Sequence, residues 1–467
     1  MRKIVMSGLV AAAAVLGCAG PAFAGTGTAG TAGTVTPAVG GKSAETALLQ
    51  AIAARYPAKS AVARIAASYV ERLSARQEAL PARPEASGGA TEVTALTGIS
   101  CASPTACLSI GEQADTSSDS GDITPIAARL HAGTWKSVPV KAPKAADFTL
   151  LEGVSCKAAT YCLVVGDAFT NSGPTGYALT WDGTKLTPVA APPVPKAYAF
   201  GLVASVSCVA VKSCVAIGIG LNAAAGEADQ LIWTWNGTKW ALTTVSPADP
   251  SADTEYTGLH CFSLTSCVAI GDRIDQTSNG DGTSTPVAAS WDGTAFTDLK
   301  APVPAGVANA AFAGLSCVSA HSCAVVGAAD TNDKGTSLLG FAEVWNGKTW
   351  TVTKWSGPAG DDQAELVGVS CTSAVRCIAV GGHGTENAAT PAALAWGGSK
   401  WTVLKVPGPG GGKAAFFEDI SCPVNGKCVT TGESGKLNTD TPEATAIAGY
   451  WNGRAWKYGP MLPAAAA

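Results

Sequence analysis

Charged residues are scarce in this sequence, at 14% of its 467 residues, and the net charge is only −4. The sequence therefore shows no basic patch that would indicate binding to nucleic acid or anionic lipid, and no acidic run that would bind a polycation. Histidine is also rare, with four residues. After the N-terminus, no apolar run approaches the roughly 20 residues that a membrane-spanning helix needs, so we expect no membrane span.

The N-terminus has the pattern of a secretory signal peptide over residues 1–24. Arg2 and Lys3 precede an apolar run over residues 4–16, and Ala-Phe-Ala stands at residues 22–24. This pattern predicts a secreted, extracellular protein. The alternative is a surface lipoprotein, because Val-Leu-Gly-Cys at residues 15–18 resembles a lipobox with Cys18 as the lipidated residue.

Cysteine, by contrast, is abundant and regular. Apart from Cys18, the cysteines form seven pairs with the same spacing: Cys101 and Cys107, Cys156 and Cys162, Cys208 and Cys214, Cys261 and Cys267, Cys317 and Cys323, Cys371 and Cys377, and Cys422 and Cys428. An even set in an exported chain predicts disulfides within each pair. Zinc is a poor alternative, because zinc pairs are usually spaced more closely and accompanied by histidines.

The cysteine pairs mark a repeat that occupies residues 91–467. First cysteines of successive pairs are 51 to 56 residues apart. In each copy an apolar run ends at the first cysteine, another begins at the second, and a third and a fourth flank a turn. The third runs into a tryptophan, replaced by His131 in the first copy, and the fourth begins at an aromatic residue, replaced by Leu186 in the second copy. We name these expected strands a, b, c and d. Seven four-stranded repeats of this length predict an all-β, seven-bladed β-propeller in which a disulfide closes each local hairpin. A β-solenoid is the second fold considered.

Two further positions recur in the repeat. A glycine follows the second cysteine by four residues in every copy, as at Gly166 and Gly218, which we interpret as a strand end before a turn. A Trp-Asn/Asp-Gly-x-x-Trp pattern, such as residues 235–240, marks the turn from c to d. We expect its tryptophans to pack between blades.

The repeat resembles the secreted bacterial BNR or Asp-box-like propeller repeats, of the broader WD40/YVTN/BNR type. The similarity lies in Ser-Cys, five residues, Cys-x-Ala-Val-Gly as at residues 377–381, and a later Asp-Gly turn before an aromatic residue. It implies the propeller fold for all seven repeats but transfers no activity. Residues 290–296 come nearest to an Asp box, yet this segment is one residue short and has Asp292 directly before the glycine.

The segment before the repeats has a different composition. Residues 25–41 and 81–90 are predicted to be linkers, because they are rich in glycine, alanine and proline. Between them, residues 42–80 carry apolar side chains at helical spacing, for example Val62, Ile65, Tyr69 and Leu73. This spacing predicts a short helical segment that packs on the ring or spaces it from the cell surface.

No local motif indicates catalysis. His131, His260, His321 and His383 fall in different repeats at unrelated positions, so we interpret them as surface or turn residues. Acidic residues gather after strand b, where we expect b-to-c loops and a candidate ligand face: Asp115, Asp119, Asp122, Asp272, Asp275, Asp281, Asp330, Asp333, Glu433 and Asp440. Residues 275–281 faintly resemble a calcium loop, but Pro286 stands where the closing glutamate belongs.

Together these observations predict an exported, non-catalytic binding module whose loop-rich face holds a glycan, a cell-wall polymer or a protein. We expect a monomer with no catalytic residues, no cofactor and no nucleic-acid partner, and calcium is the one metal considered. The alternative is a hydrolase or lyase acting on a polysaccharide at the propeller channel, because such a site is built from residues far apart in sequence.

Overall fold

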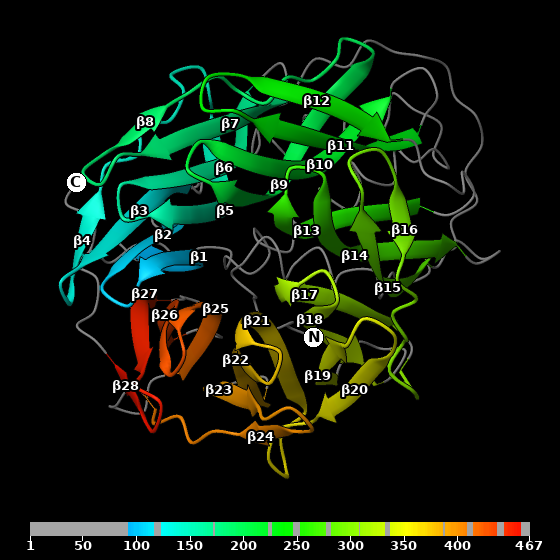
Figure 1. The fold of residues 1–467 in the computed structure, drawn as a ribbon. Coiled ribbons are helices and arrows are strands. Elements are labelled where there is room, and N and C mark those ends of the chain that lie inside the picture. The colour runs from blue at the N-terminus through cyan, green and yellow to red at the C-terminus, as the bar shows by residue number, and fades with distance from the viewer. Residues whose placement is uncertain are drawn as a thin grey trace, which may run out of the picture.

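The chain forms a ring of seven four-stranded antiparallel blades, shown by a computed structural model (Figure 1). The structure describes residues 92–115, 123–170, 173–222, 227–245, 253–276, 282–307, 309–331, 337–385, 388–408, 414–436 and 443–458. Within these ranges every regular element is a strand, and none of them contains a helix that could cross a membrane. The predicted seven-bladed propeller is confirmed. The predicted signal peptide, both linkers, the helical segment and Cys18 lie outside the described residues.

Each blade uses four consecutive strands, with strand a innermost and strand d outermost in Figure 1. Blades 1 to 3 comprise β1 (Glu92–Ser103), β2 (Ala106–Asp115), β3 (Ile123–His131), β4 (Thr134–Val138); β5 (Phe148–Ala158), β6 (Tyr161–Thr170), β7 (Gly173–Trp181), β8 (Leu186–Pro188); and β9 (Tyr198–Ala210), β10 (Ser213–Asn222), β11 (Glu227–Trp235), β12 (Trp240–Val245).

Blades 4 to 7 follow the same order. They comprise β13 (Asp253–Ser263), β14 (Ser266–Gln276), β15 (Gly282–Trp291), β16 (Phe296–Asp298); β17 (Asn309–Ser319), β18 (Ser322–Asp330), β19 (Leu338–Trp345), β20 (Trp350–Trp355); β21 (Gln363–Ser373), β22 (Arg376–Thr385), β23 (Ala388–Trp396), β24 (Trp401–Val403); and β25 (Ala414–Val424), β26 (Lys427–Lys436), β27 (Glu443–Trp451), β28 (Trp456–Tyr458).

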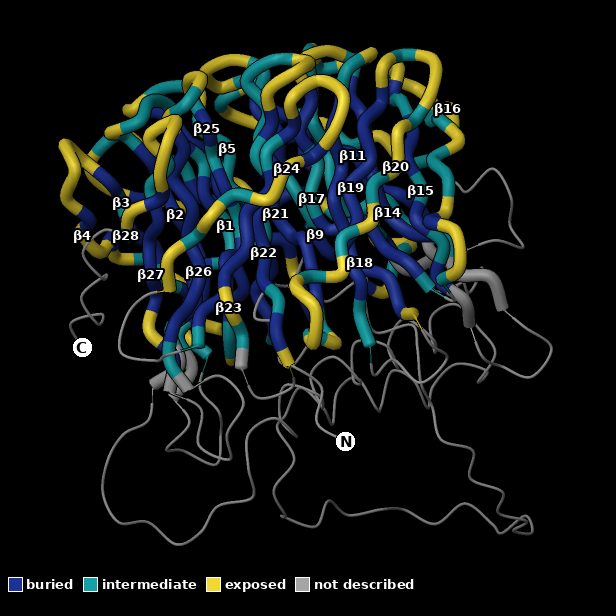
Figure 2. Tube along the Cα trace, turned by 90° about the horizontal axis from the view of Figure 1, so that it is seen from below, coloured by how far each residue is buried: buried dark blue, intermediate teal, exposed yellow. Residues whose placement is uncertain are grey.

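This strand order gives the ring two different ends. Strands a and c finish at one end, which carries the a-to-b hairpins and the c-to-d turns, and we call it the hairpin end. Strands b finish and strands c begin at the opposite end, which we call the loop end. Figure 2 shows the exposed turns of the hairpin end along the upper edge of the ring.

All seven predicted disulfides are present, one in each a-to-b hairpin. The paired cysteines lie directly opposite each other in blades 1 to 6. Their Cα atoms are 3.8 to 4.0 Å apart across the seven bridges. Each bridge therefore fixes one hairpin locally and connects no two blades.

The recurrent glycine of strand b does not end the strand, so our interpretation of it was wrong. Gly166 lies inside β6, which continues to Thr170. The partner strand has a β-bulge here, with the register shifting between Leu151 and Gly153. A Cβ at Gly166 would lie 2.0 Å from the carbonyl oxygen of Leu150. The same carbonyl approach occurs in all seven blades, so the glycine is needed for close strand contact at a bulge.

The c-to-d turns owe their sequence to local hydrogen bonds. In blade 3, Asn236 Oδ1 accepts hydrogen bonds from the backbone N–H groups of Thr238 and Lys239, both at 3.0 Å. Gly237 has φ of 91°, a left-handed conformation that favours glycine. Its Cα packs so closely on the a-to-b hairpin that an added Cβ would lie 2.7 Å from Lys212 Cβ. Turn and hairpin therefore form one contiguous surface at the hairpin end.

The hydrophobic core is divided among the spaces between neighbouring blades. One cluster joins Leu108 and Val138 of blade 1 to Leu151 and Trp181 of blade 2, and another joins blades 2 and 3 around Trp235. Trp235 donates a hydrogen bond from Nε1 to the hydroxyl of Tyr161 across that junction, at 3.1 Å. The expectation that these tryptophans pack between blades is confirmed.

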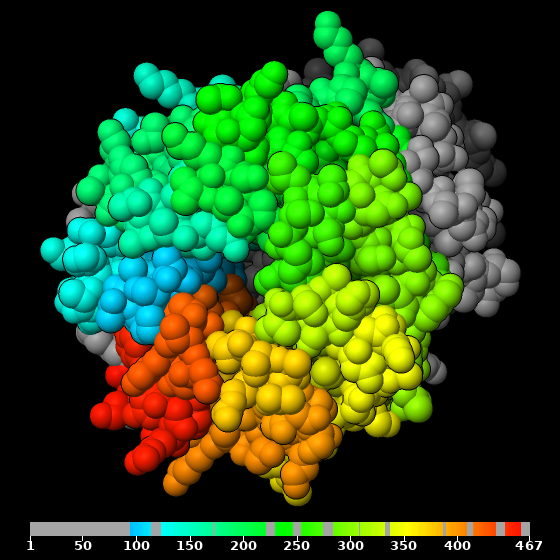
Figure 3. Space-filling model, in the orientation of Figure 1, coloured from blue at the N-terminus to red at the C-terminus, as the bar shows by residue number. Residues whose placement is uncertain are grey.

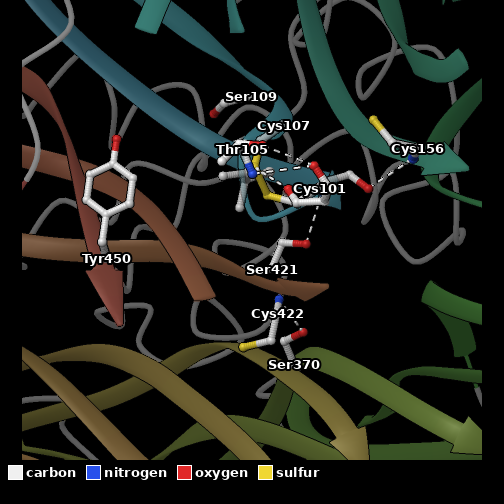
Figure 4. Close-up of a disulfide and its surroundings, with 12 residues drawn as sticks. Cys101, Thr105, Cys107, Ser109, Cys156, Ser370, Ser421, Cys422 and Tyr450 are labelled. Atoms are coloured by element: carbon white, nitrogen blue, oxygen red, sulfur yellow. Dashed lines mark hydrogen bonds between the residues drawn. A yellow bond between two sulfur atoms is a disulfide. The ribbon is translucent and has the colours of Figure 1, made fainter. Parts of the chain in front are cut away.

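A second set of contacts between blades comes from the serine before the first cysteine. In six of the seven junctions its Oγ accepts a hydrogen bond from the backbone N–H of the next blade's first cysteine, at 2.9 to 3.0 Å (Figure 4). The serines are Ser100, Ser155, Ser207, Ser316, Ser370 and Ser421. At the junction of blades 4 and 5, His260 takes this position, and the bond is absent among the described residues.

The ring closes without exchanging a strand between the first and last blades. Blade 1 contains only β1 to β4 and blade 7 only β25 to β28, and the two meet through a single parallel bridge between Val93 and Ala444. Asp419 Oδ2 accepts a hydrogen bond from the backbone N–H of Ile99 at 2.9 Å. Trp135 Nε1 donates to the hydroxyl of Tyr450 at 2.7 Å. Closure therefore depends mainly on side-chain contacts.

Candidate functional site: buried acids on the inner strands

The structure gives the ten acids of the predicted ligand face different locations. Asp272, Asp330 and Glu433 lie within β14, β18 and β26 and are 8%, 4% and 3% exposed, so they are buried strand residues. Asp115 and Asp275 are also strand residues, in β2 and β14. The other five, Asp119, Asp122, Asp281, Asp333 and Asp440, lie outside the described residues. For them the ligand face stays a prediction.

Asp272 connects two blades. It accepts a hydrogen bond from the backbone N–H of Phe312 in the next blade. Asp167 has the same position in blade 2 and accepts from the backbone N–H of Val203 at 3.1 Å. Burial raises the pKa of both carboxyls well above the ordinary value. In blade 3, where Ile219 replaces the acid, Gln230 bonds the backbone of Tyr256 instead. We therefore assign Asp272 a structural role.

A different set of carboxyls gathers around the inner strands of blades 5, 6, 7 and 1, and we call these residues the inner acids. They are Glu112, Asp330, Glu365, Glu418, Asp419 and Glu433. Glu112 and Glu433 directly follow the recurrent glycine of strand b, and Glu418 occupies the strand-a bulge of blade 7, between Phe417 and Asp419 in the register. The two glutamates after the glycine lie on the loop-end side of the bulge.

Electrostatic repulsion connects these carboxyls. Burial raises the pKa of Glu418 well above its ordinary value, and the charges of Glu433, Glu365, Glu112 and Asp419 raise it further. Burial and the charge of Asp330 raise the pKa of Glu365 to about 8. Burial raises that of Asp419 to about 6, against the lowering effect of hydrogen bonds from Ile99 and Ile420. At neutral pH Glu365 therefore largely keeps its proton, while Asp419 is largely ionised.

Two of the inner acids have an unused oxygen. Glu365 Oε2 and Glu418 Oε1 are buried and have no hydrogen-bond partner among the described residues. Glu365 is 3% exposed and Glu418 5%. A buried polar atom without a partner costs free energy, so such atoms in a native protein call for an explanation, of which a ligand is one.

An apolar group lies beside the inner acids. Ala313, Val367 and Phe416, from the inner strands of blades 5, 6 and 7, form a buried cluster. Phe416 lies opposite Glu433 in the register and packs on Gly382, where an added Cβ would be 2.4 Å from the ring. Figure 3 views the ring from its hairpin end and shows a narrow recess at the centre, where the blades meet. The inner strands thus combine carboxyls with an aromatic and an aliphatic surface.

Sequence reasoning missed Glu112, Glu365, Glu418 and Asp419. A signal was present for Glu112, because four of the seven repeats have an acid directly after the recurrent glycine: Glu112, Asp167, Asp272 and Glu433. Treating the glycine as a strand end placed Glu112 in a loop and obscured its burial, but it does not account for Glu365, Glu418 and Asp419, which lie in strand a before the first cysteine.

The histidines divide into two groups. His131 and His321 are exposed, as expected of surface residues. His383 instead lies in β22, where its Nδ1 contacts Asp361 Oδ2 at 2.5 Å and its ring meets the edge of Trp355. His260 lies in β13, and its pKa falls to about 4 because of burial and the charge of Lys157. In the part of the chain that the structure describes, neither contacts a group that would complete a nucleophile and base.

The predicted calcium loop cannot be located, because residues 277–281 lie outside the described ranges. Within those ranges no group of three histidine, cysteine or acidic side chains has the arrangement of a metal site. Calcium therefore stays a prediction from the sequence.

No protein-family model and no curated protein sequence matches the chain. Solved structures of similar fold include the β-propeller domain of the Trilobed protease from Pyrococcus furiosus, which has an open velcro topology (TM-score 0.43, 8% identity, 79% of this chain and 98% of that chain). Another is Penicillium chrysogenum α-L-arabinanase complexed with arabinobiose (TM-score 0.38, 10% identity, 77% and 98%). A third is the Niastella koreensis GH74 enzyme (TM-score 0.40, 13% identity, 79% and 67%). These similarities concern the fold alone.

Proposed function

We propose that this protein is an exported binding module that holds a glycan at the inner acids, reached from the loop end of the ring. The observation that carries the proposal is the gathering of buried carboxyls from four blades beside Phe416, with unused oxygens on Glu365 and Glu418. A protonated carboxyl both donates and accepts hydrogen bonds, which suits a hydroxyl-rich ligand. Apolar surface beside a few convergent polar groups is typical of small-ligand sites.

Export is part of this proposal. The signal-peptide pattern of residues 1–24 supports it, and so do the seven disulfides, which persist in oxidising compartments and are rare in the cytosol. Release into the medium and attachment through Cys18 both remain compatible with this proposal.

The proposal is tested by equilibrium binding of a panel of neutral and acidic oligosaccharides to the full chain. Glu418→Leu removes the central carboxyl while keeping an apolar side chain of similar size. We expect it to weaken binding of the recognised glycan about tenfold or more, because the ligand loses a buried hydrogen-bond partner. Asp147→Asn, at an exposed position in the connection to blade 2, is the matched control and should bind normally.

Binding should also fall as pH rises through the pKa of Glu365, about 8, because ionisation removes a donor. Absence of binding to every member of the panel, or equal binding by wild type and Glu418→Leu, would remove the basis of the proposal.

A polysaccharide hydrolase is the second candidate, and one observation favours it. Glycoside hydrolysis needs a carboxylic acid that keeps its proton near a carboxylate that does not. Glu365 and Glu418, with raised pKa values, share a cluster with Asp419, whose pKa of about 6 leaves it ionised at neutral pH. Release of reducing sugar from the recognised glycan would favour this candidate.

A further inference from the structure

The hairpin end of the ring has a composition that differs from the rest of the molecule. It comprises the five residues between the two cysteines of each a-to-b hairpin and the residues between the two aromatic positions of each c-to-d turn. We call this surface the hairpin face. It lies at the upper edge of the ring in Figure 2, opposite the loop end.

Positive charge is concentrated on the hairpin face. Its basic residues are Lys157, Lys185, Lys212, Lys239, Lys348, Arg376, Lys400, Lys427 and Arg454. Its acids are Asp182 and Asp292, and both side chains accept hydrogen bonds from backbone N–H groups of their own turns. The hairpin face therefore has nine basic residues and only two acidic ones, and both acids are hydrogen-bonded within their own turns. The whole protein, by contrast, has a net charge of −4.

Apolar side chains protrude from the same face. Val211, Val318, Val375 and Val424 are 50%, 39%, 52% and 47% exposed, and each lies between the two cysteines of a disulfide-closed hairpin. Within the described residues they are four of the seven large hydrophobic side chains that are exposed. Because each bridge fixes its hairpin, these valines are held outward and cannot fold back into the blade.

The valines lie on the inner part of the face, and the basic residues lie on both its inner and its outer parts. Hairpins join the inner strands a and b and carry the four valines together with four of the basic residues, whereas turns join the outer strands c and d and carry the other five basic residues. Each turn packs on the hairpin of its own blade, as Gly237 does on Lys212 and Gly398 on Val375. The face is therefore a rigid ring whose inner hairpins carry apolar and basic side chains together and whose outer turns add further basic residues.

We propose that the hairpin face docks on an anionic lipid bilayer. A basic residue near such a surface contributes about 1 kcal/mol, and apolar side chains that enter the interface add to the affinity. A soluble polyanion would gain from the charges alone and would give no reason for four exposed valines on fixed hairpins. Docking this way turns the loop end, with the inner acids, away from the lipid. The sequence concealed this surface, because no blade contributes more than two basic residues to it and blades 1 and 4 contribute none.

The test is sedimentation of the full chain with vesicles of phosphatidylcholine, with and without about one third phosphatidylglycerol. We expect binding to the anionic vesicles only, and its loss as added salt screens the charges. The triple variant K212E/R376E/K427E should bind about 100-fold more weakly. Its matched control, K144E/K196E/K405E, makes the same charge change at exposed positions in the d-to-a connections and should bind like wild type.

A second variant separates lipid from other anions. V211S/V375S/V424S keeps every charge, and we expect it to bind anionic vesicles about tenfold more weakly. Since all variants retain the same N-terminal segment, any contribution from residues 1–90 cancels in the comparison. Equal binding to neutral vesicles, equal loss in both charge variants, or unchanged binding by the valine variant would each overturn the proposal. The last result would indicate a soluble polyanion as the partner.

Discussion

At the level of single residues, the repeat has two recurrent glycines, one required by a close atomic contact and the other by its backbone conformation. The glycine of strand b is present in all seven blades because a partner carbonyl approaches its Cα, whereas the glycine of the c-to-d turn is required by its positive φ. Both appear in the sequence as invariant glycines of a repeat, and sequence alone does not separate the two causes.

Replacing the two glycines separates these causes experimentally. In Gly166→Ala the new Cβ would lie 2.0 Å from the Leu150 oxygen, so the bulge must open, and we expect a loss of about 3 kcal/mol or more in unfolding free energy. Gly133→Ala has open space but φ of 83°, and should cost only about 1 to 2 kcal/mol. Urea unfolding measures both. Equal losses would mean that backbone conformation, not the carbonyl contact, selects the glycine of strand b.

Buried acids also make stability depend on pH. Glu343 in β19 is 0% exposed, neither of its carboxyl oxygens has a hydrogen-bond partner among the described residues, and burial raises its pKa to about 8. A folded-state pKa above the unfolded value means that the protonated form stabilises the fold. This stability is complete below the unfolded pKa of 4.5 and is lost as pH rises toward about 8.

Glu343→Gln should therefore be more stable than wild type at pH 9, by about 2 to 4 kcal/mol, and should show a shallower fall in unfolding free energy between pH 4.5 and pH 8. Asp147→Asn, at an exposed position, should leave the pH profile unchanged. Identical profiles for Glu343→Gln and wild type would show that Glu343 is ionised in the folded protein.

At the level of elements, each hairpin has two separate roles. Its disulfide holds strands a and b together, and the serine before the first cysteine bonds the next blade. The sequence allowed the first role to be predicted, because a fixed spacing in an exported chain indicates local pairing. It did not allow the second, because the partner of the serine is a backbone group about one repeat away.

The junction of blades 4 and 5 tests the second role, since His260 replaces the serine there. His260→Ser should supply the missing acceptor for the Cys317 N–H and raise the unfolding free energy by about 1 kcal/mol. Ser316→Ala removes the existing bond to Cys371 and should lower it by a similar amount. Calorimetry compares the two. A destabilised His260→Ser protein would indicate that the contact of His260 with Phe262 matters more than the bond.

At the level of the whole molecule, repetition made the architecture predictable and concealed the surfaces. Blade number, strand number and disulfide pairing followed from cysteine spacing, because these properties are local to one repeat. The inner acids and the hairpin face are each assembled from single residues of several blades. Glu365 and Glu418, for instance, meet only because the ring brings β21 and β25 together.

The central claim is that the inner acids bind a ligand without transforming it, and Glu418→Gln tests it most directly. Glutamine keeps the size and the hydrogen-bonding capacity of the protonated acid but cannot transfer a proton. Binding and turnover of the recognised glycan would be measured side by side at neutral pH. A binding module should keep its affinity within about threefold, with no turnover in either protein. Turnover by the wild type that falls 100-fold or more in Glu418→Gln would contradict the account and assign Glu418 as a general acid.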